Sequence, residues 1–346
     1  MRKTLGVVMA VVLGQALEAQ TAMPKYEVDP SWPKPLPHRW VLGGLGGVCV
    51  DAQDHVFILN RQDVLEGDLN AGSLAPSIIE FDRAGNVVNS WGDPNLLDPR
   101  LHGCYFDKDN NVWMASAPSG MVQKYSHDGE LLFQIGTKGV FDSSDGTVGG
   151  TPLNSDEARF FSPASVYVDP KNGDVYVADG EGRGTNRRIA VMNRNGQFLR
   201  QWRPEGMETV HCMTVARDGL VYVCNRENSR IQVYDQGGVF LRNIEVPWKP
   251  YTRPEDGIPK ESGGSAVSVA LSQDPNETRL YVINQNNVRI EIINRETGRI
   301  LTSFGGGVGH FPGQFDQPHG IAVDSEGSVY VTENRGKRVQ RFTIVR

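Results

Sequence analysis

Short apolar runs separated by turn residues recur along the whole chain. A typical unit has an apolar run ending in Asp, a turn with Gly or Asn, the phrase Val-Tyr-Val, a polar break, and a run of the form Arg-Ile-x-Val before another Gly turn. Apolar and polar residues alternate with a period of two within these runs, which is typical of half-buried β-strands. Each unit therefore predicts four short antiparallel strands, here named A to D in chain order.

The unit occurs six times, at a spacing of about 45 to 65 residues when the connecting loops are included. The copies run from Gly47 to Gly92, Gly103 to Gly136, Ala164 to Trp202, His211 to Val246, Val267 to Gly305, and Gly320 to the C-terminus. Four-stranded repeats of this size are typical of β-propeller blades. The pattern predicts an all-β fold, a six-bladed β-propeller over residues 43–346.

The last repeat is incomplete, and a spare segment precedes the first one. The sixth copy stops after about three strands, near Ile344, while Tyr26–Pro35 contains no full unit. We expect this segment, within an N-terminal region of residues 20–42, to supply the missing strand of the last blade. Such closure would leave no open sheet edge.

The N-terminus has the pattern of a secretory signal peptide over residues 1–19. Arg2 and Lys3 precede the apolar stretch Leu5–Leu13, and small residues follow it. That stretch is too short to span a membrane. We therefore expect an exported protein, secreted or periplasmic, without a membrane partner. The net charge of −6 comes without a basic stripe, so nucleic acid is not expected as a partner, and we expect a monomer.

Four cysteines lie in predicted strands: Cys49, Cys104, Cys212 and Cys224. An even number in an exported protein permits disulfides. Buried thiols, however, behave as ordinary small core residues, and we expect these four to be free. Only Cys212 and Cys224, which flank one hairpin, are near enough in sequence to suggest a bridge.

Three histidines occupy the same point of alternate repeats. His102, His211 and His319 each stand where strand A begins, and they are 109 and 108 residues apart. The same position in the other repeats holds small or apolar residues: Gly46, Ala164, and Ala266 or Val267. One such histidine is more often a packing residue, but three on alternate blades predict three imidazoles around the ring axis. Three histidines with one open position are the pattern of a catalytic zinc.

The long insertions all fall in B–C or D–A connections, whereas the A–B and C–D turns are tight. The insertions are Gln62–Pro76, Thr137–Phe161, Glu181–Arg187, Pro247–Gly264 and Gly305–Phe315. In a propeller these connections share one face, the face where strand A begins. The predicted histidines therefore lie on the loop-rich face, where function is usually found.

Two arginines end strand B on this same face, as Asn60-Arg61 and Asn225-Arg226. A guanidinium binds a carboxylate in bidentate fashion, so the pair predicts a small-molecule or peptide substrate that carries a carboxylate. The alternative is that each arginine pairs with a neighbouring acid, Asp63 or Glu227.

From about residue 43 onward the chain resembles NHL-repeat propellers, and more narrowly the peptidyl-α-hydroxyglycine α-amidating lyases. The stretches Asn225–Gln232 and Phe315–His319 carry most of the likeness. The resemblance implies that His102, His211 and His319 bind zinc and that Arg61 and Arg226 are active-site residues. It further implies cleavage of the carbon–nitrogen bond of a carbinolamide, giving an amide and glyoxylate.

Two positions depart from the family pattern. The family's structural calcium would use the carbonyls of Val48 and Cys104 and an acidic residue after the third histidine, but Gly320 stands there, which argues against calcium. The family's catalytic tyrosine would follow Asp179-Gly180, but Glu181 stands there and becomes the candidate general base. A zinc-activated water is the alternative base and would also permit hydrolysis.

The favoured function is thus an exported zinc-dependent lyase acting on a carbinolamide or related α-hydroxy acid derivative. The alternative is a non-catalytic propeller that binds a peptide or protein on the loop-rich face, with the histidines holding a structural metal. A calcium-dependent lactonase is disfavoured, because such sites need Glu, Asn and Asp at the ring instead of histidine.

Overall fold

A computed structural model describes residues 23–345, apart from 99, 118, 144–153, 183, 253–258 and 261–263. The predicted signal peptide, residues 1–19, lies outside the described residues. In the described part of the chain, no helix is long and apolar enough to cross a membrane.

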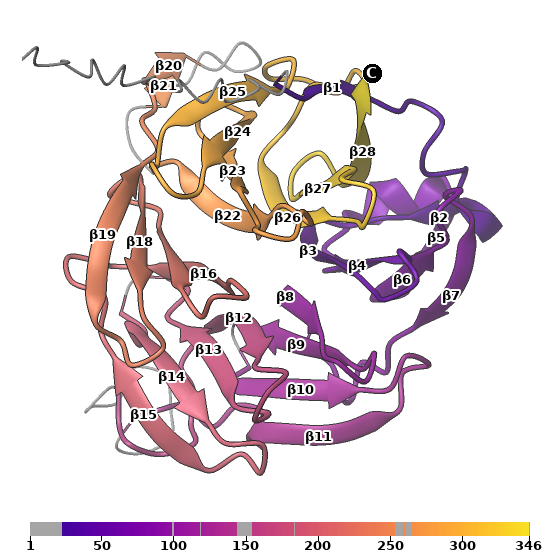
Figure 1. Ribbon diagram of the computed structural model, residues 1–346. Helices are drawn as coiled ribbons and strands as arrows, with labels where there is room; N and C mark the ends of the chain where they lie inside the picture. The colour runs from indigo at the N-terminus through magenta and orange to yellow at the C-terminus, as the bar shows by residue number, and fades with distance from the viewer. Residues whose placement is uncertain are drawn as a thin grey trace, which may run out of the picture.

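Six four-stranded antiparallel sheets surround a common axis (Figure 1). Blades one to three comprise β3 (Leu45–Val50), β4 (Val56–Asn60), β6 (Ile78–Phe81) and β7 (Val87–Trp91); β8 (Leu101–Phe106), β9 (Val112–Ser116), β10 (Met121–Tyr125) and β11 (Leu131–Gly136); and β12 (Pro163–Val168), β13 (Val175–Asp179), β14 (Arg188–Met192) and β15 (Phe198–Trp202). Blades four to six comprise β16 (Val210–Val215), β17 (Val221–Asn225), β18 (Arg230–Tyr234) and β19 (Phe240–Glu245); β22 (Ala266–Leu271), β23 (Arg279–Asn284), β24 (Arg289–Asn294) and β25 (Ile300–Phe304); and β26 (Pro318–Val323), β27 (Val329–Glu333), β28 (Arg338–Val345) and β1 (Lys25–Val28). The prediction of a six-bladed β-propeller is confirmed.

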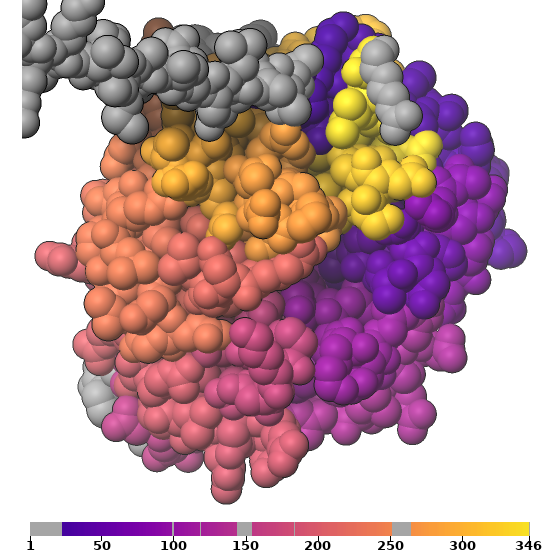
Figure 2. All heavy atoms as spheres, viewed as in Figure 1, coloured from indigo at the N-terminus to yellow at the C-terminus, as the bar shows by residue number. Residues whose placement is uncertain are grey.

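The outermost strand of blade six comes from the N-terminal segment. β1 pairs antiparallel with β28, with Tyr26 opposite Ile344. The Tyr26 ring is buried, stacks on Phe304 of blade five, and its hydroxyl lies 2.8 Å from the hydroxyl of Tyr281. Both ends of the described chain therefore lie side by side, as the indigo and yellow segments show (Figure 2).

The hydrophobic core is divided among the six seams between neighbouring blades. Ile58 belongs to a cluster shared with Tyr330 of blade six, whereas Phe57 and Leu59 belong to a cluster shared with Met114 of blade two. Successive side chains of a strand point to opposite faces, so strand B contributes apolar side chains to the seams on both sides of its blade. This explains why strand B is almost continuously apolar in the sequence.

The cysteines form two disulfides, Cys49–Cys104 and Cys212–Cys224, so the expectation of free thiols was wrong. The first joins β3 to β8, the inner strands of two different blades, across a Cα–Cα distance of 5.8 Å. That distance suits a disulfide, but the blade packing that creates it is not visible in the cysteine spacing. The second is the bridge that the hairpin suggested.

The remaining short elements lie in the N-terminal segment and the long insertions. They are the 3-10 helices Pro37–Arg39 (η1) and Glu66–Asn70 (η2), and the strand pairs β2 (Trp40–Val41) with β5 (Ser73–Leu74) and β20 (Tyr251–Thr252) with β21 (Pro259–Lys260). Each insertion connects strands B and C or strands D and A, as expected, so the described ends of the insertions lie at one face of the ring.

Candidate metal centre

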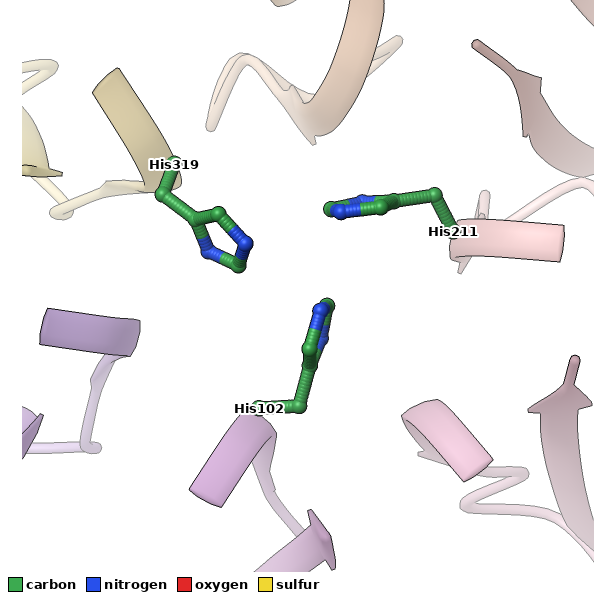
Figure 3. A group of neighbouring side chains, drawn as sticks. All are labelled: His102, His211 and His319. Carbon is green, nitrogen blue, oxygen red and sulfur yellow. The ribbon is translucent and has the colours of Figure 1, made fainter. Parts of the chain in front are cut away.

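The structure brings the three predicted histidines together at the axis. His102, His211 and His319 are the second residues of β8, β16 and β26, the inner strands of blades two, four and six. Their imidazoles point toward one another (Figure 3), and one nitrogen from each lies within 4.8 Å of the others. The pairing register with strand B shifts at each histidine. Such a bulge re-aims the side chain, here toward the axis.

The other nitrogen of each ring is held by the neighbouring blade. The three hydrogen bonds run from Nδ1 of His102 to the Ala164 carbonyl (2.9 Å), of His211 to the Val267 carbonyl (2.7 Å), and of His319 to the Gly46 carbonyl (2.6 Å). Since a carbonyl only accepts, Nδ1 carries the hydrogen and the Nε2 lone pair faces the axis. The small or apolar residues that alternate with the histidines therefore provide the backbone carbonyls that orient the imidazoles.

The environment keeps the three imidazoles neutral. Burial lowers the pKa of His102 and His211 well below the usual value, and burial together with the Arg61 charge lowers that of His319 to about 3. The Nε2 atoms of His102 and His211 are buried without a hydrogen-bond partner. Convergent, neutral and unpartnered imidazole nitrogens are the donors that zinc takes in proteins. These residues fit a zinc ion.

Glu181 lies directly beside this cluster. It begins the connection between β13 and β14, and its Oε2 is 3.6 Å from Nε2 of His211, while its Oε1 is 4.0 Å from Nε2 of His102. Burial raises the pKa of Glu181, against the opposing charges of Arg226 and Arg61. A carboxylate held here could accept a proton or serve as a further metal ligand.

Arg61 is buried behind the first residue of β8. Its Nε donates to the Leu101 carbonyl (3.2 Å), one residue before His102. A Cβ on Gly46 would collide with that carbonyl and lie 3.0 Å from the guanidinium, so the site requires glycine there. Burial lowers the pKa of Arg61 to about 10, which leaves it charged at neutral pH. The carboxylate of Asp63, the partner that the alternative supposed, accepts from the Gly44 backbone instead (2.5 Å).

Arg226 connects the cluster to the surface. One terminal nitrogen lies 3.1 Å from Oε1 of Glu227, the neighbouring acid that the alternative supposed, and the other lies 3.9 Å from Oε1 of Glu181. Its Nε is buried without a hydrogen-bond partner. The guanidinium thus keeps a donor for a further acceptor.

The inner strands also line a cavity of about 540 Å³, with the histidines at one end. Val48 and Cys104 are among its lining residues, whereas Arg61, Arg226 and Glu181 are not. A Cβ on Gly320 would lie 2.6 Å from Oγ1 of Thr332 and 3.0 Å from Cα of Gly47. A side chain at position 320 would therefore crowd the Thr332 hydroxyl and the backbone of β3.

A family model for the NHL repeat matches residues 209–234 and 315–342. The two segments cover most of the described strands of blade four and nearly all of β26 to β28 in blade six, including His211 and His319. The protein contains NHL repeats. Each matched NHL repeat corresponds to one blade, and the histidine lies near its start.

Curated relatives extend the likeness over most of the chain. The chain is 27% identical over 345 residues to peptidyl-glycine alpha-amidating monooxygenase B of Xenopus laevis, covering 92% of this chain and 35% of that protein. It is 28% identical over 336 residues to NHL repeat-containing protein 3 of Homo sapiens (92% and 84% covered) and 25% identical over 351 residues to peptidyl-alpha-hydroxyglycine alpha-amidating lyase 1 of Drosophila melanogaster (92% and 59%). The chain spans about a third of the length of the first of these relatives. The predicted resemblance is confirmed.

A solved structure described as a streptogramin B lyase has the same fold. It superposes with a TM-score of 0.58 at 12% sequence identity, covering 92% of this chain and 98% of that one. At this identity the likeness supports the propeller architecture alone.

Some residues that shape the site were not singled out in the sequence. Asp179, two residues before Glu181, is fully buried and accepts from Arg188 Nε (2.9 Å) and Asn186 Nδ2 (2.6 Å). Arg188 is the arginine of the recurring Arg-Ile phrase, so the repeat pattern contained the signal. This buried network fixes both ends of the connection that presents Glu181.

Proposed function

We propose that the protein is a zinc-dependent lyase that cleaves the carbon–nitrogen bond of a carbinolamide or related α-hydroxy acid derivative. The observation that carries the proposal is the set of three neutral imidazoles whose Nε2 atoms converge at the axis, bordered by Glu181, Arg61 and Arg226. The presence of lyases among the relatives supports the same class of reaction.

His102, His211 and His319 would hold the zinc through Nε2. When bound, zinc supplies a Lewis acid that lowers the pKa of the substrate hydroxyl. The proton of that hydroxyl would pass to Glu181, since burial raises the basicity of its carboxylate. The carbon–oxygen double bond then forms as the carbon–nitrogen bond breaks, and the leaving nitrogen takes up a proton. The products are an amide and glyoxylate.

Arg61 and Arg226 would hold the carboxylate of the substrate. Arg61 is charged at neutral pH and lies against the carbonyl of Leu101, one residue before His102. Arg226 lies 3.9 Å from Glu181 and keeps a buried Nε–H without an acceptor. Charge-assisted hydrogen bonds of this kind orient a planar carboxylate. A small molecule or the C-terminus of a peptide would satisfy this requirement.

The decisive experiment is to measure glyoxylate release from α-hydroxyhippurate by zinc-loaded protein. We expect turnover that disappears on chelation and returns with zinc. Full zinc loading without turnover would contradict the amidating reaction, and a panel of other α-hydroxy acid derivatives would then test the wider lyase class.

A non-catalytic peptide-binding propeller is the second candidate. Two observations favour it: Glu181 replaces the tyrosine expected from the resemblance, and Glu227 already pairs with Arg226. In that case the protein would bind zinc and retain peptides with a free carboxylate without converting them. We also propose export, which N-terminal sequencing of the mature protein would test by locating a new terminus near Gln20.

A further inference from the structure

A second cluster of metal-ligand side chains lies on the opposite face of the ring, at the seam between blades one and two. Asp51 and His55 belong to the turn between β3 and β4, Glu80 to β6, and His127 to the turn between β10 and β11. This cluster takes no part in the proposed lyase reaction.

One imidazole nitrogen faces two buried carboxylates. Nε2 of His127 lies 3.0 Å from Oδ2 of Asp51 and 3.5 Å from Oε1 of Glu80, and the three ligand atoms all lie within 4.8 Å of one another. Nδ1 of His55 lies 2.6 Å from the same Glu80 oxygen. The side chains of Asp51 and Glu80 are 0% and 3% exposed, whereas those of His55 and His127 are about a third exposed.

The other blades show that a carboxylate is unusual at the position of Glu80. Glu80 pairs with Phe57, the aromatic residue near the start of strand B. The corresponding partners in blades two to six are Lys124, Val191, Val233, Ile292 and Arg341. This position therefore holds a cation in two blades, an apolar residue in three, and an acid only in blade one.

The consequence is that an acid stands where blade two has a lysine. In blade two, Lys124 pairs with Asp107 (2.8 Å), which stands where Asp51 stands in blade one. Blade one replaces that lysine with a second acid, so two buried carboxylates lie side by side, and Oε2 of Glu80 has no hydrogen-bond partner. Buried carboxylates are costly unless a cation is bound between them.

We propose that Asp51, Glu80 and His127 bind a divalent transition-metal ion, with His55 as an additional ligand. Mixed imidazole and carboxylate donors suit Zn²⁺ better than Ca²⁺ or Mg²⁺, which prefer all-oxygen sites. The ion would join blade one to blade two, because His127 alone comes from the second blade. In blade one the ion would stand where blade two has the lysine–aspartate ion pair, and it would link two blades.

The test is to count zinc sites on metal-depleted protein, by titration against a chromophoric chelator and by elemental analysis. We expect two equivalents in the wild type and one in His127→Ala. His211→Ala, which alters the axial site, should also bind one, and the double variant none. His310→Ala is the matched control, since this histidine is 70% exposed and lies near a single acid, Asp316, and it should retain both.

Glu80→Gln distinguishes the loss of a metal ligand from misfolding, because it keeps the shape of the side chain and removes its charge. In the His211→Ala background, added Zn²⁺ should raise the melting temperature, and Glu80→Gln should abolish that rise. Two results would overturn the proposal. One is that His211→Ala binds no zinc, and the other is that Glu80→Gln still binds a full second equivalent. If the axial site fails instead, wild type and His211→Ala both bind one equivalent and His127→Ala binds none.

Discussion

At the scale of single residues, the axial histidines are oriented before any metal arrives. Each Nδ1 is committed to a backbone carbonyl, so the ring tautomer and the direction of Nε2 are both fixed. A preformed site loses little conformational entropy on binding, which favours affinity.

His211→Ala should lower the zinc content by one equivalent per chain and leave the propeller folded. The variant loses one donor and one hydrogen bond to Val267, whereas the seam clusters around it are unchanged. Elemental analysis and far-ultraviolet circular dichroism measure both outcomes. Zinc content equal to that of wild type would refute the tri-histidine site.

Glu181→Gln should reduce turnover about 10²- to 10⁴-fold, the usual contribution of a general base, while zinc content stays the same. The amide keeps the shape of the carboxylate but cannot accept the proton. Steady-state kinetics of glyoxylate release measure the effect. Unchanged turnover would assign proton transfer to a different group, such as a zinc-activated water.

At the residue level, the sequence predicted which side chains lie together where a residue type recurs at a fixed point of the repeat. The histidines and arginines were placed in this way, because strand A begins and strand B ends at equivalent places in each copy. The proximity of Glu80 and His127 was not predicted, since it depends on how two blades pack and His127 lies in an ordinary turn.

At the scale of elements, each inner strand serves two seams, and the two disulfides differ in what they connect. Cys49–Cys104 links neighbouring blades across 55 residues, whereas Cys212–Cys224 links two paired strands across 12. A disulfide removes more conformational entropy from the unfolded chain when it closes a longer loop, so it stabilises the folded state more.

Replacing both cysteines of the inter-blade bridge by alanine should therefore cost about 4 kcal/mol of unfolding free energy, against about 3 kcal/mol for the hairpin bridge. Urea unfolding of the two double variants at neutral pH measures the difference. Equal losses would show that loop length does not govern these bridges.

The strand β1 is tied to β28 by an ion pair between Asp29 and Arg341. Burial opposes ionisation of Asp29, but hydrogen bonds from Arg341 and Ser31 outweigh it and lower its pKa from 3.8 to about 2. The folded state thus holds the ionised form more strongly than the unfolded chain does. Its contribution is complete above about pH 4 and disappears as the pH falls toward 2.

Asp29→Asn should consequently lose stability on the order of 1–2 kcal/mol at pH 5, but much less at pH 2.5. The measurement is the urea midpoint of both proteins at the two pH values. A difference between variant and wild type that stays constant with pH would contradict the assignment.

At the scale of the whole molecule, blade six is completed by a strand from the other end of the chain. Strand counts predicted this arrangement, because the sixth repeat lacked one strand and the N-terminal segment contained one. The contact of Tyr26 with Tyr281 and Phe304 in blade five was not predictable, since nothing in a single strand specifies which ring it meets.

Deleting residues 23–35 should destabilise the entire ring and promote aggregation, because β28 would become an exposed edge. Thermal unfolding and light scattering measure the two effects. Tyr26→Phe is the control: it keeps the ring stack and loses one hydroxyl contact, at a cost of about 1 kcal/mol. A truncated protein that unfolds like the wild type would refute a closing role for β1.

The hydrogen bonds from the three histidines cross alternate seams, between blades two and three, four and five, and six and one. The affinity of the axial site for an ion would therefore depend on the alignment of all six blades, because opening any of these seams breaks the hydrogen bond that orients one imidazole. The metal would then dissociate when a single seam opens, before any blade unfolds. The same coupling would allow an event at another seam, such as reduction of Cys49–Cys104, to change the affinity at the centre.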